Sequence, residues 1–312
     1  MIDDLATTLI DRLGAERVRR DVPLAPLTTF KVGGPADLLV DVTSVDDLSF
    51  VIQAAATAAA PVRVIGGGSN LLVADRGVRG VVVRLRLAEV DQTAPDAVRA
   101  GAGLTINGLV RWTVGRGLAG LEAWAGTPGT VGGAICGNAH YGGRNISERV
   151  RAVGLVDRAG QIVAASRDAM AFAYDTSRVQ RSGEVVIWAE FGVSAGDAGL
   201  LRAAARASLA HRKLTQPLAS QSAGCVFQNP DPSRDRVPAG IPASAGALVD
   251  RAGLKGHRIG GAVISDLHAN FVVNAGGATA ADIAALLALA RDTVRARFGV
   301  VLRDEIVRLG EW

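Results

Sequence analysis

The chain has 312 residues, and its 49% hydrophobic and 21% charged residues are typical of a folded protein and exclude a disordered one. The net charge of +4 does not indicate nucleic-acid binding, because the 34 basic residues form no basic run and aromatic residues make up only 4%. The two cysteines and four histidines have no metal-ligand spacing, so we expect neither a disulfide-rich scaffold nor a metal site. Without a long apolar stretch or a basic N-terminus, we expect a cytoplasmic protein that does not bind membranes. We also expect a monomer without a nucleic-acid partner.

Helix and strand signals alternate along the first two thirds of the chain. A capping-box variant at Ser44 predicts a helix that ends before Pro61, and Thr105 is the expected cap of another helix. The turn Arg158-Ala-Gly160 between two apolar runs predicts a β-hairpin. In chain order, we expect a helix at 44–60, strands at 62–65 and 81–87, a helix at 105–117, hairpin strands at 150–157 and 161–165, a strand at 184–193 and a helix at 197–213.

The pattern changes after Pro217. We expect a strand-like segment at 224–229, proline-rich turns, a helix at 244–252, a strand at 271–274, a helix at 279–298 and a closing strand at 300–309. The helix at 197–213 is the expected joint between a larger N-terminal domain and a C-terminal one of about 100 residues.

Three glycine-rich segments are the first candidates for a ligand site: Lys31–Pro35, Gly66–Leu72 and Gly126–Ala134. Glycine permits positive φ angles and lets backbone N–H groups approach an anion, which suits a pyrophosphate, although any one segment could equally be a tight turn. The chain has no P-loop motif, and no segment has the dinucleotide fingerprint in a strand–turn–helix context. Several separate segments therefore favour FAD over a nucleoside triphosphate.

Two further residues are candidates for catalysis. Cys225 lies between a glycine and an apolar pair, where a thiol could act as a proton donor or nucleophile, or pack as a small buried hydrophobe. Glu305 falls on the expected closing strand, where a buried carboxylate could polarise a substrate carboxylate or enol. A glutamate exposed at the rim remains the alternative, because strand alternation does not decide between them.

Five segments resemble one known family, and they occur in its order: Thr28–Pro35, Gly66–Leu72, Gly126–Gly133, Ser222–Pro230 and Leu302–Glu305. The chain is similar to the UDP-N-acetylenolpyruvoylglucosamine reductases from about residue 20 to 310, in the shorter type without an inserted substrate loop. The resemblance implies an α+β fold. A two-part FAD-binding unit of the vanillyl-alcohol-oxidase (PCMH) type would span 1–205, with lobes at about 1–80 and 81–205, before a smaller α+β substrate-binding domain at 206–312.

The resemblance also implies the reaction. Hydride would pass from NADPH to N5 of non-covalently bound FAD, and then to the vinyl carbon of UDP-N-acetylglucosamine enolpyruvate. The product would be UDP-N-acetylmuramate, a precursor of peptidoglycan. Cys225 matches the family's serine or cysteine that gives the proton, and Glu305 matches the glutamate that stabilises the enol intermediate or relays the proton.

The resemblance assigns the remaining binding residues position by position. Those expected at FAD are Gly66, Gly67, Gly68, Ser69, Asn70, Leu71, Gly126, Thr127, Pro128, Gly129, Thr130, Gly132, Gly133 and Asn138. Those expected at the UDP-sugar are Tyr174, Lys213, Gln228, Asn229, Lys255 and Arg258.

This chain departs from the family's pattern at two places. Asp175 stands where the family's F-x-Y-R-x-S segment has an arginine that pairs with the substrate carboxylate, and an aspartate there has the wrong charge. Arg178 is the candidate cation for that role. His140 lies in a loop that is one residue shorter than usual and is expected beside the flavin, where a histidine without a catalytic role is the favoured interpretation.

Two alternatives to the reductase remain open. The first is an FAD-linked oxidase of the same fold, against which the segments around Cys225 and Glu305 argue. The second is a catalytically altered nucleotide-sugar-binding homologue, which Asp175 keeps open.

Overall fold

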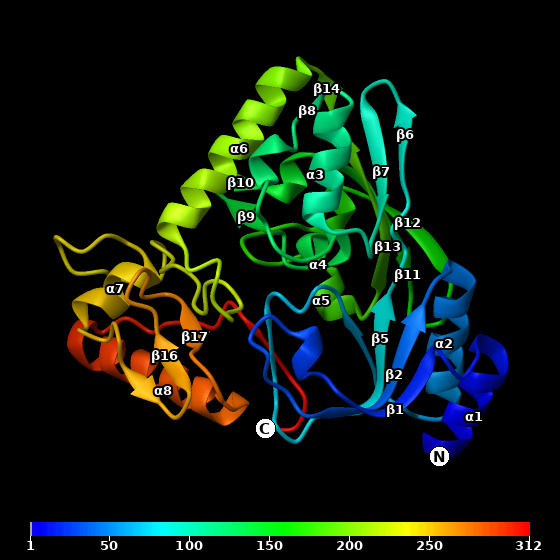
Figure 1. The fold of residues 1–312 in the computed structure, drawn as a ribbon, viewed down its shortest axis with the longest axis horizontal. Helices are drawn as coiled ribbons and strands as arrows, with labels where there is room; N and C mark the ends of the chain where they lie inside the picture. Colours follow the sequence, from blue (N-terminus) through cyan, green and yellow to red (C-terminus); the bar gives the residue numbers. More distant parts are fainter. Residues whose placement is uncertain (1) are drawn as a thin grey trace. The chain divides into compact units, whose positions relative to one another are not determined.

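Two separate hydrophobic cores organise the chain, whose residues 2–312 are described in the computed structural model (Figure 1). The first unit comprises residues 2–22, 36–67 and 79–211. The second unit comprises 23–35, 68–78 and 212–312, so it takes two short segments from the N-terminal part of the chain. The boundary between the units falls within a helix, at 211/212, and the domain limit expected at 205/206 stays a prediction.

The first unit contains a four-stranded sheet with the strand order β1-β2-β5-β3. Helices α1 (Ile2–Leu13) and α2 (Val45–Thr57) lie beside this sheet (Figure 1). Their buried apolar side chains belong to the same core as those of the sheet. As predicted, the Ser44 side chain caps α2 by accepting a hydrogen bond from Asp47 N. The strands are β1 (Val18–Pro23), β2 (Pro35–Val42), β3 (Val62–Ile65) and β5 (Val78–Leu85).

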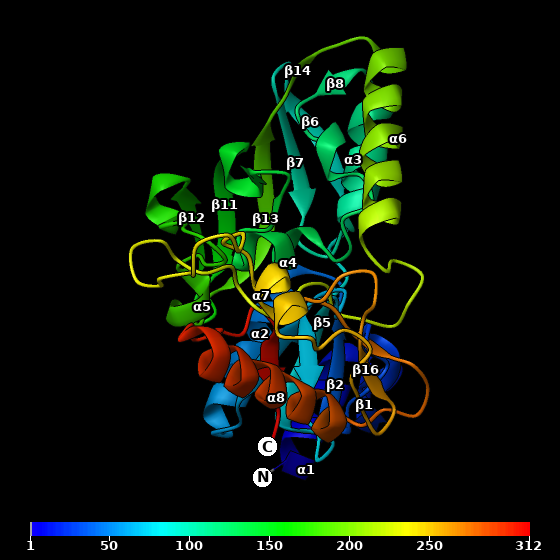
Figure 2. The ribbon, with the colours of Figure 1, turned by 90° about the vertical axis from the view of Figure 1, so that its left-hand side faces the viewer.

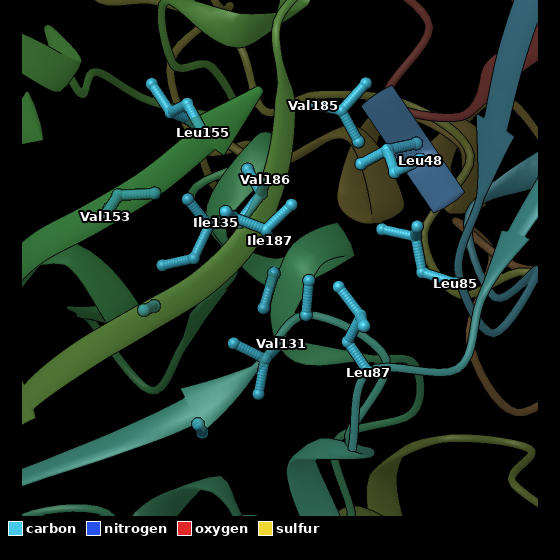
Figure 3. Packing of buried hydrophobic residues seen from close by; sticks show 14 of the residues in the cluster. Leu48, Leu85, Leu87, Val131, Ile135, Val153, Leu155, Val185, Val186 and Ile187 are labelled. Carbon is cyan, nitrogen blue, oxygen red and sulfur yellow. The ribbon is translucent and has the colours of Figure 1, made fainter. Parts of the chain in front are cut away.

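A five-stranded antiparallel sheet forms the rest of the core of this unit, with the order β12-β11-β13-β7-β6. Figure 3 shows Val131 and Ile135 of α4 close to Val186 and Ile187 of β13, all of them buried. The predicted hairpin is confirmed as β11 paired with β12. The elements are β6 (Val90–Ala94), β7 (Ala97–Gly101), α3 (Ile106–Gly115), α4 (Val131–Cys136), β11 (Val150–Val156), β12 (Ile162–Ser166) and β13 (Val185–Gly192).

Short elements and one long helix complete the first unit. The short elements are β8 (Leu118–Ala119), β9 (His140–Tyr141), β10 (Arg144–Asn145), α5 (Val179–Ser182) and β14 (Ser194–Ala195). Helix α6 (Ala198–Thr215) matches the predicted helix at 197–213 and continues into the second unit. None of the described helices is long and apolar enough to cross a membrane.

The second unit packs two helices with a small antiparallel sheet of order β15-β16-β17. Figure 2 shows both helices and the middle strand of this sheet. Thr279 and Asp282 form a full capping box at the start of α8, as the sequence predicts. The elements are β4 (Leu71–Val73), α7 (Ala245–Arg251), β15 (Arg258–Ile259), β16 (Ala262–Ile264), β17 (Val272–Asn274), α8 (Ala280–Phe298) and β18 (Val307–Leu309), of which β4 and β18 pair in parallel. The predicted fold class is confirmed: both units mix helices and strands, and the smaller one holds the C-terminal hundred residues.

Two predicted strands are wrong. The segment 224–229 forms no strand, and only residues 307–309 of the predicted strand at 300–309 are extended in a ladder. The two segments pair at the isolated bridge Phe227↔Asp304, and the pairing does not extend into a ladder on either side of it. Glu305 therefore lies in a loop that is anchored by isolated hydrogen bonds.

Asp41 on β2 joins three arginines on the first sheet. Its carboxylate accepts hydrogen bonds from Arg84 Nε (2.5 Å) and Nη2 (2.6 Å), from Arg19 Nη2 (2.9 Å) and from Arg86 Nε (3.2 Å). Burial raises the pKa of Asp41, but the hydrogen bond and charge of Arg84 and the charges of Arg86 and Arg19 outweigh burial, so its pKa lies below the ordinary value.

We expect Asp41→Asn to lower the free energy of unfolding at pH 7 by about 1–2 kcal/mol, because three cations lose their shared partner. A carboxylate with a lowered folded-state pKa stabilises the protein above its unfolded pKa and loses this contribution as the pH falls through the folded pKa. Urea denaturation between pH 7 and 3 should therefore show a shallower acid-side decline for the variant than for the parent. Exposed Asp11 of α1 provides the control Asp11→Asn, and equal pH profiles for parent and Asp41→Asn would contradict the assignment.

Candidate functional site

Two of the glycine-rich segments meet in the first unit. A Cβ atom on Gly67 would lie 2.9 Å from the Cα of Gly129, and one on Gly66 would lie 2.5 Å from Oγ1 of Thr130. Neither position can carry a side chain without displacing the opposite backbone or the buried cap residue. The result is a cradle (Gly66, Gly67, Gly129 and Thr130) that is lined almost entirely by backbone, as close approach to a pyrophosphate requires.

Asn107 in the first turn of α3 holds this cradle. Its Oδ1 accepts a hydrogen bond from Gly126 N (2.7 Å), and its Nδ2 donates to the carbonyl of Thr127 (3.2 Å). Gly129 O accepts from Ile106 N (3.1 Å), which ties the loop to the same helix. Sequence analysis missed Asn107, although an asparagine two residues after the Thr105 cap is a residue type whose side chain often bonds backbone groups.

Asn138 makes structural hydrogen bonds within the first unit, and its expected role at FAD stays a prediction. It is 3% exposed and adopts a left-handed φ of +44°, and its Nδ2 donates to the carbonyl of Ala173 (2.8 Å). Its Oδ1 accepts from Ser147 N (3.3 Å). Asn138 therefore joins the chain after α4 to the turn at 173–176.

That turn brings the two departures from the family pattern together. His140 Nδ1 lies 2.9 Å from Oδ1 of Asp175, although 35 residues separate them in the sequence. The ring of Tyr174, an expected substrate contact, lies 5.0 Å from the His140 ring between centroids and is 45% exposed. Sequence analysis placed His140 near the flavin but did not predict this pair.

Arg178 has another partner. Its guanidinium forms a two-point ion pair with Glu184, with Nη2–Oε1 and Nε–Oε2 distances of 2.6 and 2.9 Å. Burial raises the pKa of Glu184, but hydrogen bonds from Arg178 and Ser182 and the Arg178 charge outweigh it, so the pKa is lowered. The role of Arg178 toward a substrate stays a prediction, and this pair leaves its charge already compensated.

In the second unit, backbone contacts bring three predicted site segments together. Glu305 N donates to the carbonyl of Val226 (2.9 Å), so Glu305 is fixed beside the residue that follows Cys225. Asn70 Nδ2 donates to the carbonyl of Glu305 (3.1 Å), and Val307 N donates to Asn70 O (2.9 Å). Cys225 is partly buried, and its backbone forms an isolated antiparallel β-bridge with Phe271.

The other expected residues of this unit are more scattered. Gly68 is packed against Leu27, where a Cβ would lie 2.0 Å from the carbonyl oxygen, and Leu71 opens β4. Gln228 N donates to Arg303 O, and Oδ1 of Asn229 accepts from Ala245 N at the start of α7. The three cations expected at the UDP-sugar are all exposed. They are Lys213 in the last turn of α6, Lys255, which pairs with Asp250 at 3.0 Å, and Arg258 on β15.

The comparisons with known proteins agree with the residue pattern. A family model described as the C-terminal domain of UDP-N-acetylenolpyruvoylglucosamine reductase matches residues 216–309, and an FAD-binding-domain model matches 36–166. The reductase of Geobacter metallireducens is 39% identical over 312 residues and all of both chains, and that of an Anaeromyxobacter species is 42% identical over 97% of this chain and 92% of the relative. The solved structure of the Thermus caldophilus reductase matches with a TM-score of 0.79 and 33% identity, covering 94% of this chain and 99% of that one.

These relatives extend along the whole chain and include its C-terminal unit, and the fold observed here is shared with the solved relative. FAD is the cofactor that the matched binding domain takes, and the glycine cradle lies within or beside that domain. The chain belongs to the UDP-N-acetylenolpyruvoylglucosamine reductase family of flavoenzymes.

Proposed function

We propose that the protein reduces the enolpyruvyl ether of UDP-N-acetylglucosamine to UDP-N-acetylmuramate with NADPH, in the synthesis of peptidoglycan precursors. The observation that carries this proposal is the pairing of the Cys225 segment with the Glu305 segment through Glu305 N and Val226 O. It supports a proton donor and a carboxylate on two loop segments that are joined by a backbone hydrogen bond. Bound FAD supplies the hydride chemistry of this reaction.

Cys225 acts in this proposal by giving a proton to the carbon next to the carboxylate. A thiol can do so only while it carries its proton, so an environment that favoured the thiolate would oppose this role. Glu305 stabilises the enol form of the substrate or relays the proton, and the bond from Asn70 to its carbonyl fixes its main chain.

The cofactor site combines the cradle with its neighbours. Gly66, Gly67 and the segment 126–133 would hold the pyrophosphate of non-covalent FAD, because a backbone-lined surface admits phosphate oxygens closely. Asn138 supports this site by positioning the chain after α4. The residues 68–71 are assigned to FAD by the family pattern alone.

The UDP-sugar would be bound by cations and amides of the second unit. Lys255 and Arg258 flank permissive glycines, and Lys213, Gln228 and Asn229 occupy matching family segments. Tyr174 in the first unit would contact the substrate. The proposal includes action in the cytoplasm, since both nucleotide substrates are small, water-soluble anions, and it takes the protein as a monomer.

Anaerobic half-reactions test the function. The purified protein should show the visible spectrum of oxidised flavin, lose it on addition of NADPH, and regain it when UDP-N-acetylglucosamine enolpyruvate is added without oxygen. Reoxidation by oxygen but not by the enol ether would indicate an oxidase. A flavin-free protein that binds the UDP-sugar would indicate the altered binding homologue.

Replacing Cys225 tests the proton donor. Cys225→Ala should slow flavin reoxidation by the enol ether by roughly 10²–10⁴-fold, because the acid is lost, whereas Cys225→Ser keeps a hydroxyl proton and should retain most of the rate. Reduction of the flavin by NADPH should be unchanged in both variants. Equal reoxidation rates for the alanine variant and the parent would remove Cys225 from the mechanism.

Replacing Gly67 tests the cradle. Gly67→Ala should weaken FAD binding by at least about tenfold, or roughly 1.4 kcal/mol, because its Cβ meets the backbone of Gly129 at 2.9 Å. Gly115→Ala in α3 is the matched control, since nothing lies within 4 Å of its added Cβ. Flavin content by absorbance, and FAD titration of the apoprotein, would measure the effect. Parent-like affinity in Gly67→Ala would place the pyrophosphate elsewhere.

A further inference from the structure

The segment that carries Cys225 is held by the buried side chain of Asn270, on the turn before β17. Both ends of the Asn270 amide bond the backbone of one residue: Oδ1 accepts a hydrogen bond from Phe227 N (3.0 Å), and Nδ2 donates to Phe227 O (2.8 Å). Only this orientation of the amide pairs a donor with an acceptor at both contacts. The main chain adds a third bond, because the carbonyl of Asn270 accepts from Val226 N (2.9 Å).

These bonds replace a β-ladder that stops just after Cys225. The antiparallel pairing at Cys225 would continue if Asn270 N donated to Val226 O. Instead, Asn270 N donates to Nδ1 of His268 (3.2 Å), and Val226 O accepts from Glu305 N (2.9 Å). The side-chain amide of Asn270 therefore takes the place of the next peptide group of the ladder, and it satisfies buried backbone groups that would otherwise lose these bonds.

A β-bulge lies directly before Cys225. Two isolated bridges bound it, Gln221↔Asn274 and Cys225↔Phe271. Their residues are four positions apart on the side of Cys225 and three positions apart on the other side. The extra residue falls on the segment with Gly224, whose φ of +79° is typical of a bulge with a left-handed glycine. Because a bulge re-aims the side chains beside it, the direction of Cys225 depends on what fixes the backbone after it.

The same segment is bonded on its other side to the loop that carries Glu305, through Glu305 N and Val226 O. The segment with Cys225 thus runs between two neighbours, and Asn270 supplies most of the bonds to one of them. An acid that protonates one particular carbon needs a fixed position, because proton transfer requires hydrogen-bond reach and small displacements slow it strongly.

We propose that Asn270 is a positioning residue for Cys225: its side-chain amide fixes the backbone after the bulge and so places the thiol that protonates the substrate carbon. This rests on the proposed function, which gives Cys225 that role. Asn270 acts only through the backbone of Val226 and Phe227 and contacts neither flavin nor substrate. Its effect is confined to reoxidation of the flavin, since reduction by NADPH takes no proton from the thiol.

Half-reactions of the holoenzyme test this role. In Asn270→Leu, which keeps the branched shape but removes both amide groups, the limiting rate of anaerobic reoxidation by the enol ether should fall roughly ten- to a hundredfold. The enol ether concentration at half-maximal rate, and the rate of flavin reduction by NADPH, should each stay within about threefold. The matched control Asn274→Leu removes another buried amide of the second unit, which bonds Phe30 O, Gly276 N and Ala278 N. It should lower stability but leave reoxidation within about threefold of the parent.

The variant Asn270→Asp gives a reversible test. A protonated carboxyl offers one acceptor and one donor, as the amide does, whereas a carboxylate would face the Phe227 carbonyl without a proton to donate. The reoxidation rate of Asn270→Asp, divided by that of the parent, should rise as the pH falls from about 8 to 5.5, because protonation restores the second bond. Dividing by the parent removes the titration of the neighbouring groups His268, Cys225 and Glu305. The same ratio for Asn270→Leu should not change with pH.

A double-mutant cycle completes the test. Adding Asn270→Leu to Cys225→Ala should cause no further loss of the reoxidation rate, because Asn270 acts only through Cys225. Additive effects, a parent-like rate in Asn270→Leu, or equal slowing in Asn274→Leu would overturn the inference. If Asn270→Leu does not fold, a ratio for Asn270→Asp that is independent of pH would overturn it as well. A parent enzyme that the enol ether does not reoxidise, or a normal rate in Cys225→Ala, contradicts the proposed function instead.

Discussion

The backbone of Gly67 runs so close to that of Gly129 that a single methyl group between them would force one of them to move. The loop that contains Gly129 is held on both sides. Asn107 of α3 accepts a hydrogen bond from its Gly126, and α4, which follows the loop, places Val131 and Ile135 in the buried core (Figure 3). A rigid core beneath two glycine loops lets the loops present backbone alone, which side chains would otherwise cover. The proposed cofactor site thus depends on a close approach that only glycine permits.

The same helix carries the second feature of the unit. The carbonyl of Cys136, at the end of α4, accepts hydrogen bonds from both Ser177 and Gln180, and so the turn with Asp175 is fixed relative to the cradle. On that turn the Asp175 carboxylate lies 2.9 Å from Nδ1 of His140, although 35 residues separate the two in the sequence.

The second unit is built from three separate stretches of chain. Asp75 accepts hydrogen bonds from Ala280 N (2.9 Å) and Ala281 N (3.0 Å) and so caps α8 from more than 200 residues away, while Asn274 Nδ2 donates to the buried carbonyl of Phe30 (2.9 Å). These bonds satisfy polar groups that would otherwise be buried without partners. They explain why short N-terminal segments belong to a unit that is otherwise C-terminal.

Sequence alone determined the features that depend on neighbouring residues. The caps at Ser44, Thr105 and Thr279, the hairpin turn and the family motifs are all set within a few positions of chain, and the structure contains each of them. Tertiary structure decided the rest. The apolar runs at 224–229 and 300–309 resemble strands but pair through isolated bridges, because a ladder needs a partner in register, and periodicity cannot supply one. Two ion pairs, His140–Asp175 and Arg178–Glu184, likewise depend on which backbone segments pack together. The sequence identified charged residues of the candidate site, but their partners follow from the tertiary structure.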